Sequence, residues 1–209
     1  MTALAVLSNP VDQPMPPTTR DSTRAALFDA GLALIERHGV AYATLARVGA
    51  AAGVSRQSVY LHFGSRAGFL LGLVDYVNER EGFDKAGARV QAAATADAAL
   101  REIIALRAES APRLEPLISA LGSAMGQDEL VADVWKKRQA LRWRTFVQLA
   151  TRMQKERMLR RGMSMEDAAA LMWSATSFET WRYLVLTRGW SSRKYTKHIH
   201  DMITRTVGP

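Results

Sequence analysis

The 209-residue sequence contains no cysteine, and this absence removes several kinds of chemistry at once. Without thiols the chain has no disulfide, no thiolate nucleophile and no thiolate ligand for a metal ion, as is usual in a reducing compartment. The sequence also lacks a basic segment followed by an apolar core and a cleavage site at its start. No apolar run approaches the roughly 18 residues that a membrane span needs. We therefore expect a cytoplasmic protein that does not span a membrane.

The patterns that mark enzymes and metal sites are missing as well. The sequence has no GxxxxGK, no GxGxxG after a strand, no HExxH and no GxSxG. Its four histidines are dispersed, and His198 and His200 are two residues apart, which directs them to different faces of a helix. We expect no catalytic residue, no metal site and no cofactor, and hence a protein that is not an enzyme.

Period-two runs of valine, isoleucine and threonine are absent, so no β-strand is predicted. Apolar residues make up 48% of the chain, which is enough for the core of one large or two small domains. Their helical spacing predicts an all-α fold. The net charge of +8 favours a polyanionic partner. However, residues 20–80 carry seven arginines against five acidic residues, so a nucleic-acid partner has to be argued from a motif.

That motif is the stretch 44–66, TLARVGAAAGVSRQSVYLHFGSR, which predicts two short helices joined by a tight turn. Thr44 and Ser55 are suited to cap the two helices, and Gly53 stands where the turn needs a positive φ. In the second helix Val59 and Phe63 are four residues apart and are predicted to point inward. The polar side chains left on its outer face are Arg56, Gln57, Ser58, Tyr60 and His62.

This outer face offers the groups that hydrogen-bond to base edges and phosphates. A helix of two turns is marginal in isolation, so a rigidly held polar face indicates a function. In a helix–turn–helix the second helix enters the major groove with its N-terminal residues on the bases, which here are Arg56, Gln57 and Ser58. An ordinary helical hairpin with a polar solvent face remains the alternative interpretation of the pattern alone.

The segments 51–55 (AAGVS), 59–63 (VYLHF) and 64–66 (GSR) together resemble the DNA-binding signature of the tetracycline-repressor (TetR) family. The resemblance covers about residues 20–75 and implies a dimeric transcription factor, usually a repressor released by a small ligand. Two positions depart from the family pattern: Arg66 stands where lysine is more common, and Gly49 lies inside the first helix, at a cost of up to ~1 kcal/mol against alanine. The resemblance implies that DNA is contacted by Thr44, Ser55, Arg56, Gln57, Ser58, Tyr60, His62 and Arg66. Of these, Thr44, Tyr60, His62 and Arg66 match positions that mostly hold phosphates in the family.

The rest of the chain predicts three parts. Residues 1–19 hold four of the seven prolines and are predicted to be a flexible arm. Arg20 at its end could reach into a minor groove, and an arm that simply trails in solvent is the favoured alternative. Residues 20–80 form the DNA-binding domain, and residues 81–209 form a helical ligand-binding and dimerisation domain. Pro112 is predicted to begin a helix. Beyond the motif a helix is expected from Arg66 past Val77, without a clear end, and further helices are expected over 95–110, 112–124, 129–160, 165–188 and 191–206.

All five tryptophans and most of the methionines lie in the second half of the sequence, and such side chains are suited to line an apolar pocket. Residue by residue, packing in the core is the alternative, but the TetR resemblance implies a ligand cavity in this region. We expect a small hydrophobic ligand near Trp135, Trp143, Phe146, Trp173, Phe178 and Trp181. The small residues of 165–188, namely Ala168, Ala175 and Ser177, suggest the contact face of a homodimer. One hairpin recognises few base pairs, so a dimer on a palindromic double-stranded operator is expected.

Two other classes of protein compete with a ligand-responsive repressor. One is a helical carrier that sequesters small molecules and keeps a vestigial DNA-binding head. The other is an all-α enzyme with unrecognised catalytic groups. The intact polar face of residues 56–62 argues against the first, and the missing catalytic motifs argue against the second.

Overall fold

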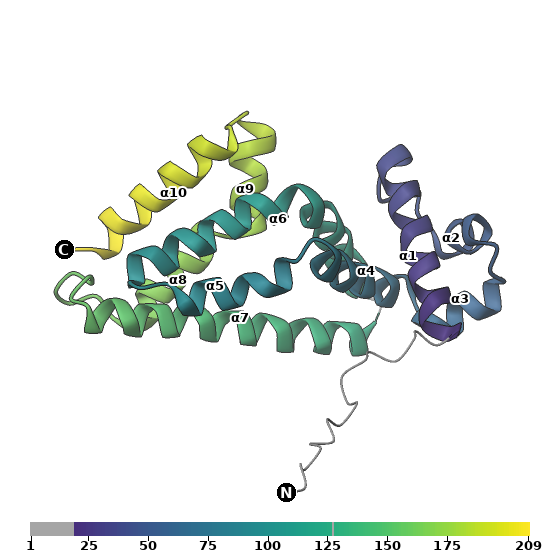
Figure 1. The fold of residues 1–209 in the computed structure, drawn as a ribbon, viewed down its shortest axis with the longest axis horizontal. Helices are drawn as coiled ribbons and strands as arrows, with labels where there is room; N and C mark the ends of the chain where they lie inside the picture. Colours follow the sequence, from purple (N-terminus) through teal and green to yellow (C-terminus); the bar gives the residue numbers. More distant parts are fainter. Residues whose placement is uncertain (1–18, 127) are drawn as a thin grey trace, which may run out of the picture.

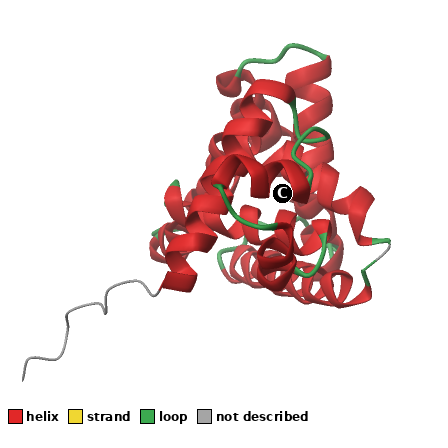
Figure 2. Cartoon of the chain, turned by 90° about the vertical axis from the view of Figure 1, so that its right-hand side faces the viewer, coloured by secondary structure: helices red, strands yellow, loops and turns green. Residues whose placement is uncertain are grey.

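The computed structural model describes residues 19–126 and 128–209, and the described elements are all helical (Figures 1 and 2). The predicted arm, apart from Thr19, lies outside the described residues, as does the side chain of Arg20. Among the described helices, none combines the length and apolar character needed to cross a membrane. The all-α prediction is confirmed. In chain order the elements are α1 (Thr19–His38), α2 (Leu45–Ala52), α3 (Arg56–Phe63), α4 (Arg66–Arg80), η1 (Phe83–Lys85), α5 (Ala86–Ala92), α6 (Ala96–Met125), α7 (Glu129–Lys155), α8 (Met165–Ala175), α9 (Phe178–Trp181), η2 (Arg182–Thr187) and α10 (Ser192–Val207).

The molecule is elongated, with α1, α2 and α3 at one end and α8 to α10 toward the other (Figure 1). Its buried apolar residues form two clusters. The first cluster joins α1 to α4 with the C-terminal part of α6 and includes Leu27, Phe28, Val48, Val59, Phe63, Leu70, Leu73, Leu114, Leu117 and Leu121. The second cluster joins the N-terminal part of α6 with α7, α8 and α10 and includes Leu100, Ile104, Ala111, Phe146, Met153, Met172, Tyr195 and Ile199.

Helix α6 connects the two clusters and corrects one prediction. Pro112 does not begin a helix, because α6 continues through both Pro112 and Pro116. An interior proline costs about 3 kcal/mol, since it removes a hydrogen bond and clashes with a carbonyl. Burying a leucine contributes about 1.5–3 kcal/mol, so the leucines that follow offset this cost. Those leucines are Leu114, Leu117 and Leu121, whereas residues up to Ala111 pack in the second cluster.

The predicted helix 165–188 is interrupted at Thr176, which is a second correction. Helix α8 ends at Ala175, and the Ser177 hydroxyl caps α9 by accepting the backbone N–H of Thr180 at 3.0 Å. The carbonyl of Thr176 accepts hydrogen bonds from two arginines of other helices instead of continuing the helix: Arg107 Nε at 2.7 Å and Arg142 Nη2 at 3.1 Å. The chain then forms a π-helix, η2, before α10. Helix α7 also ends earlier than predicted, at Lys155.

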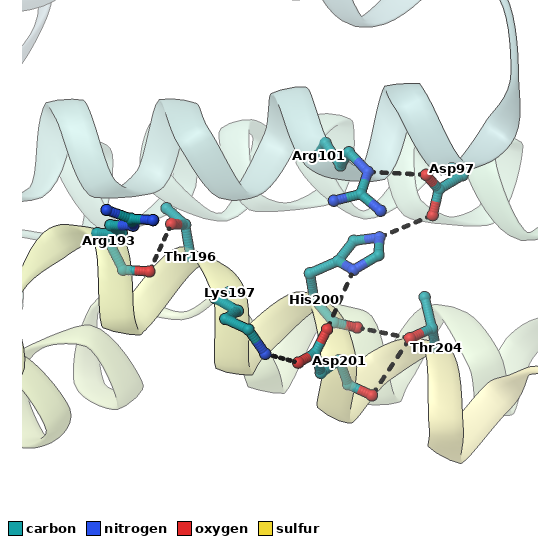
Figure 3. A network of polar contacts seen from close by, with 8 residues as sticks. All are labelled: Asp97, Arg101, Arg193, Thr196, Lys197, His200, Asp201 and Thr204. Atoms are coloured by element: carbon teal, nitrogen blue, oxygen red, sulfur yellow. Dashed lines mark hydrogen bonds and ion pairs between the residues drawn. The ribbon is translucent and has the colours of Figure 1, made fainter.

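A polar network fastens α10 to the start of α6 (Figure 3). The buried His200 side chain places Nε2 2.7 Å from Oδ1 of Asp97, and Arg101 Nε donates to Oδ2 of the same carboxylate at 2.8 Å. Burial tends to raise the pKa of Asp97, but the hydrogen bonds from Arg101 and His200 outweigh it and lower the pKa. The second cluster is therefore closed at this end by polar contacts as well as by packing.

Candidate nucleic-acid interface and internal cavity

The helix–turn–helix is built from local hydrogen bonds that the sequence predicts. Thr44 Oγ1 accepts the backbone N–H of Arg47 at 3.3 Å, and Ser55 Oγ accepts that of Ser58 at 3.2 Å. Between the two helices Gly53 has a φ of 67°, in the left-handed region that favours glycine. The two caps and the turn glycine are thus confirmed, and they fix where α3 begins.

Gly49 has a packing role that explains its departure from the family pattern. It is buried in α2, and a Cβ atom at this position would lie 2.8 Å from Val59 Cγ2 and 3.0 Å from the carbonyl oxygen of Val54. Any larger residue would therefore push α3 away from α2. The close approach of α2 and α3 that Gly49 permits offsets the cost of a glycine inside a helix.

Helix α3 divides into the two faces that its sequence predicts. Val59 and Phe63 are buried in the first cluster. On the outer face Arg56, Gln57 and Tyr60 are exposed, with the Arg56 guanidinium 5.6 Å from the Tyr60 ring, while the side chains of Ser58 and His62 are half-buried. Leu61 is absent from the predicted set of DNA-contacting residues, yet 73% of it is exposed. Leu61 lies midway between Val59 and Phe63 in sequence and therefore off the buried face of α3. This spacing could have predicted its exposure.

Basic side chains flank α3 and are held by the turn before α2. Arg66 Nη2 donates to the carbonyl of Val40 at 3.1 Å, and Arg47 Nη1 donates to that of Tyr42 at 3.3 Å. The Arg47 guanidinium also lies 3.8 Å from the centre of the Tyr42 ring. Each guanidinium has five N–H donors, so both keep donors for a phosphate. Both arginines are exposed.

Two polar contacts join α4, which follows the helix–turn–helix directly, to α7. The Ser65 hydroxyl, the N-cap of α4, donates to the carboxylate of Asp128, the N-cap of α7. Further along, Arg138 of α7 forms a bidentate ion pair with Asp75 of α4, with N–O distances of 2.5 and 2.6 Å. The hydrogen bond from Ser65 also lowers the pKa of Asp128. The start of α4 and the start of α7 are therefore mechanically coupled.

A cavity of about 1040 Å³ lies among α4, α5, α6, α7, α8 and α9. Four of the six predicted aromatic residues line it: Trp135, Phe146, Trp173 and Phe178. The positions of the other two differ from the expectation. Trp181 is only 3% exposed and belongs to the second cluster, whereas Trp143 packs against that cluster, with its ring centre 6.0 Å from that of Trp173. Both residues are part of the packing around the cavity and outside its lining.

Arg107 and Arg142 also line this cavity, although they are absent from the predicted set. The Arg107 guanidinium lies 3.6 Å from the centre of the Phe178 ring, and that of Arg142 lies 4.3 Å from the centre of the Trp173 ring. Burial lowers the pKa of Arg107 to about 9 and that of Arg142 to about 10. Helical spacing in the sequence could have indicated both arginines. Arg107 lies three residues after the buried Ile104, and Arg142 lies four residues before the buried Phe146, so each shares a helix face with a buried residue.

The small residues predicted to form a dimer face are placed differently. Ala168 and Ala175 are buried in the second cluster of their own chain, because α8 packs against α7 and α10. The same part of the molecule exposes larger apolar residues, which the small-residue pattern does not capture. These are Leu171 of α8, Tyr183 and Leu186 of η2 and Met202 of α10.

Comparisons with known proteins agree with this architecture. Residues 27–73 match the family model described as bacterial regulatory proteins, tetR family. No curated protein matches the sequence.

Solved structures extend the likeness to nearly the whole chain. NalD of Pseudomonas aeruginosa, the secondary repressor of the MexAB-OprM multidrug efflux pump, is 20% identical with a TM-score of 0.64, covering 91% of this chain and 98% of NalD. FadR of Bacillus subtilis, in complex with stearoyl-CoA, is 12% identical with a TM-score of 0.66, covering 86% and 97%. A transcriptional regulator of Saccharomonospora viridis, in complex with choline, is 18% identical with a TM-score of 0.69, covering 90% and 98%.

At these identities the structures establish a shared fold, while the family model identifies the DNA-binding domain. The match over residues 27–73 identifies this region as the DNA-binding domain of the tetR family of bacterial regulatory proteins, and nearly the whole chain shares the fold of the solved regulators.

Proposed function

We propose that the protein is a homodimeric repressor that binds a palindromic operator and is released from it by a small organic ligand. The observation that carries the proposal is the rigidly capped helix α3, which presents Arg56 and Gln57 to solvent at the end of the molecule opposite α10 (Figure 1). In this proposal residues 20–80 bind DNA and residues 81–209 bind the ligand and a second copy of the chain.

The DNA contacts fall into two groups in this proposal. Arg56, Gln57 and Ser58, at the N-terminal end of α3, read base edges in the major groove, and the exposed Leu61 is suited to contact a thymine methyl group. The phosphates are held by Thr44, Tyr60, His62 and Arg66, with Arg47 adding a further cation. Ser55 contributes mainly by capping α3, since its hydroxyl accepts the N–H of Ser58.

Dimerisation follows from what one helix–turn–helix can recognise. A single α3 reads a few base pairs, so two copies at a fixed separation are needed for a specific operator. The exposed apolar residues Leu171, Leu186 and Met202 lie on α8, η2 and α10, far from α3, and are suited to pack against a second copy. Such a contact leaves both recognition helices free to meet the same face of the DNA.

Ligand control depends on the coupling between α4 and α7. Both helices line the cavity, through Val74 and Asp75 of α4 and Trp135 and Arg138 of α7. A ligand that displaces α7 would therefore pull on α4 through the contact of Ser65 with Asp128 and change the separation of the two α3 helices. NalD is described as a repressor, and the FadR and S. viridis structures contain stearoyl-CoA and choline, which supports a ligand-binding role for the cavity of this fold.

The test is to select DNA from a random pool with the purified protein and to measure binding of the selected sequence by fluorescence anisotropy. We expect an inverted repeat with half-sites about one helical turn apart and a stoichiometry of two chains or a multiple of two. Failure to enrich any sequence, with ligand binding intact, would favour the carrier with a vestigial head.

A further inference from the structure

The cavity contains two positive charges that no carboxylate of the protein neutralises by direct contact. Four arginines line it, and two of them are paired: Arg138 with Asp75, and Arg152 with Glu156. In the part of the chain that the structure describes, Arg107 and Arg142 form no ion pair. These two guanidinium groups are adjacent, because both donate to the same oxygen atom, the carbonyl of Thr176.

Most of their hydrogen-bonding capacity remains available. A guanidinium group has five N–H donors, and the structure shows one bond from each group. The faces of the two groups lie against the rings of Phe178 and Trp173, which leaves their edges for polar contacts. Both residues are half-buried because they border the cavity, so these edges can reach a molecule inside it.

The surroundings leave about one net positive charge. Burial lowers the pKa of Arg107 to about 9, with the positive charge of Arg142 adding to the effect, yet both arginines remain protonated near neutral pH. Glu179, an exposed residue at the cavity edge, is the carboxylate whose negative charge acts on both. Tyr195 stays neutral because burial raises its pKa to about 12. Arg138 and Arg152 are already paired with Asp75 and Glu156, so the excess of one positive charge is local to Arg107 and Arg142, on which Glu179 acts and Glu79, which also lines the cavity, does not.

Capping the end of α8 does not account for both arginines. One donor satisfies a carbonyl lone pair, whereas removing a charged group from water costs several kcal/mol unless an opposite charge compensates. Two neighbouring half-buried guanidinium groups therefore favour a bound anion, and the protein supplies Glu179, which acts on both without forming an ion pair with either. An acidic ligand would supply it.

We propose that the cavity binds an organic monoanion, with its carboxylate held by Arg107 and Arg142 and its apolar part along the aromatic and aliphatic wall. This inference deepens the proposed function, because it takes the cavity as the ligand site of the regulator. The planar fork of arginine matches a carboxylate, and the local excess of one positive charge at Arg107 and Arg142 matches a single negative charge. The ligand is thus amphiphilic, which modifies the purely hydrophobic ligand predicted from the aromatic residues. The apolar wall includes Val90, Ile103, Leu106, Trp135, Phe146 and Leu149.

The experiment compares acids with their isosteric neutral amides on the full-length protein without DNA. Three pairs are titrated by calorimetry and tryptophan fluorescence: decanoate and decanamide, hexadecanoate and hexadecanamide, and 2-naphthylacetate and 2-naphthylacetamide. We expect at least one acid to bind tenfold or more tightly than its amide, because charge-assisted hydrogen bonds are about twice as strong as neutral ones. Amides that bind as tightly as their acids, no binding by any pair, or tighter binding of the dianion decyl phosphate than of decanoate would each overturn the proposal.

Variants then locate the anion. Arg107→Met and Arg142→Met keep an aliphatic stem and remove the charge, and Arg144→Met is the control, an exposed arginine of α7 outside the cavity lining. We expect the first two to reduce the acid-over-amide preference to about twofold or less while the amide affinity stays unchanged. Equal weakening of acid and amide would contradict the assignment. If a variant fails to fold by circular dichroism, the comparison of acid and amide on the unmodified protein still decides.

Adding DNA separates this inference from the proposed function. An acid that prefers the cavity over its amide yet leaves the affinity for selected DNA unchanged would contradict ligand release and leave the anion site intact. Release of DNA by acid and amide alike would contradict the anion site and leave ligand release intact.

Discussion

Arginines serve in two contrasting regions of this protein. On and beside α3 they are exposed and close together in sequence, and the two beside it, Arg47 and Arg66, donate to the carbonyls of Tyr42 and Val40. In the cavity Arg107 and Arg142 come from different helices, lie against aromatic rings and share one carbonyl. Water and salt screen the exposed charges, whereas the half-buried charges of the cavity are screened less. The exposed set is suited to a long polyanion and the half-buried set to a single small anion.

The largest effect is expected from a change that prevents dimerisation, because it should greatly weaken operator binding and leave ligand binding in the cavity intact. Leu186→Glu places a charge on the exposed apolar surface of η2, where 60% of the leucine is exposed in one chain. If this surface meets a second copy, the buried carboxylate prevents association. We expect loss of the dimer in analytical ultracentrifugation and a fall in operator affinity of about 100-fold or more, because the two half-sites no longer bind together. Ligand binding in the cavity should persist.

Leu130→Glu is the matched control, since this leucine is 82% exposed at the start of α7. It should remain dimeric. A Leu186→Glu protein that still sediments as a dimer would show that the interface uses another surface.

A second change disrupts the DNA-binding surface from within. Gly49→Val inserts a side chain where a Cβ atom already lies 2.8 Å from Val59. We expect a decrease of about 1–3 kcal/mol in unfolding free energy from overpacking, together with loss of operator binding as α3 shifts. Ligand affinity in the cavity should be unchanged.

Chemical denaturation measures the free energy of unfolding, and calorimetry measures the affinity for the ligand. Gly126→Ala is the control, because nothing lies within 4 Å of a Cβ atom there, its φ of −60° suits alanine, and it lies outside the cavity lining. Normal operator binding by Gly49→Val would mean that α2 and α3 tolerate separation.

A third change sharpens the assignment of base-reading residues without altering the fold. Gln57→Ala removes an exposed amide at the N-terminal end of α3. We expect the preference for selected over random DNA to fall by about 1–3 kcal/mol for each base that the amide recognises, with ligand binding unaffected. Competition binding measures the preference, and Arg193→Ala on the distant α10 serves as the control. Full discrimination by Gln57→Ala would remove this residue from the base-reading set.

The smallest effect concerns phosphate binding. Arg66→Ala removes one exposed cation beside α3 and its hydrogen bond to Val40. We expect selected and random DNA to weaken about equally, and the slope of log affinity against log salt to become shallower by about one unit. An unchanged slope would mean that Arg66 only supports the turn before α2.

The helix–turn–helix was predictable because its determinants are local. Thr44 and Ser55 cap helices through donors three residues away, and Gly53 supplies a backbone conformation within one turn. Each of these interactions is fixed by neighbouring residues in sequence. The role of Gly49 was different, because it depends on the distance between α2 and α3.

The features that the sequence did not predict depend on interactions between distant segments. Helix α6 continues through Pro112 because both of its ends are buried, one in each cluster. The break at Thr176 forms where Arg107 and Arg142 reach its carbonyl, 69 and 34 residues away along the chain. The cavity combines residues of several helices, so an aromatic-rich composition indicated its existence but could not distinguish Trp173, which lines it, from Trp181, which does not.

The most direct test of the account is reciprocal linkage between the cavity and the DNA. The affinity of the tightest-binding carboxylate for the protein is measured with and without saturating selected DNA, and the affinity for that DNA is measured with and without saturating carboxylate. A regulator released by its ligand must show both affinities weakened by the same factor, and typical couplings of about 1–3 kcal/mol correspond to roughly 5- to 150-fold. A carboxylate that binds equally well to free and DNA-bound protein would contradict the account.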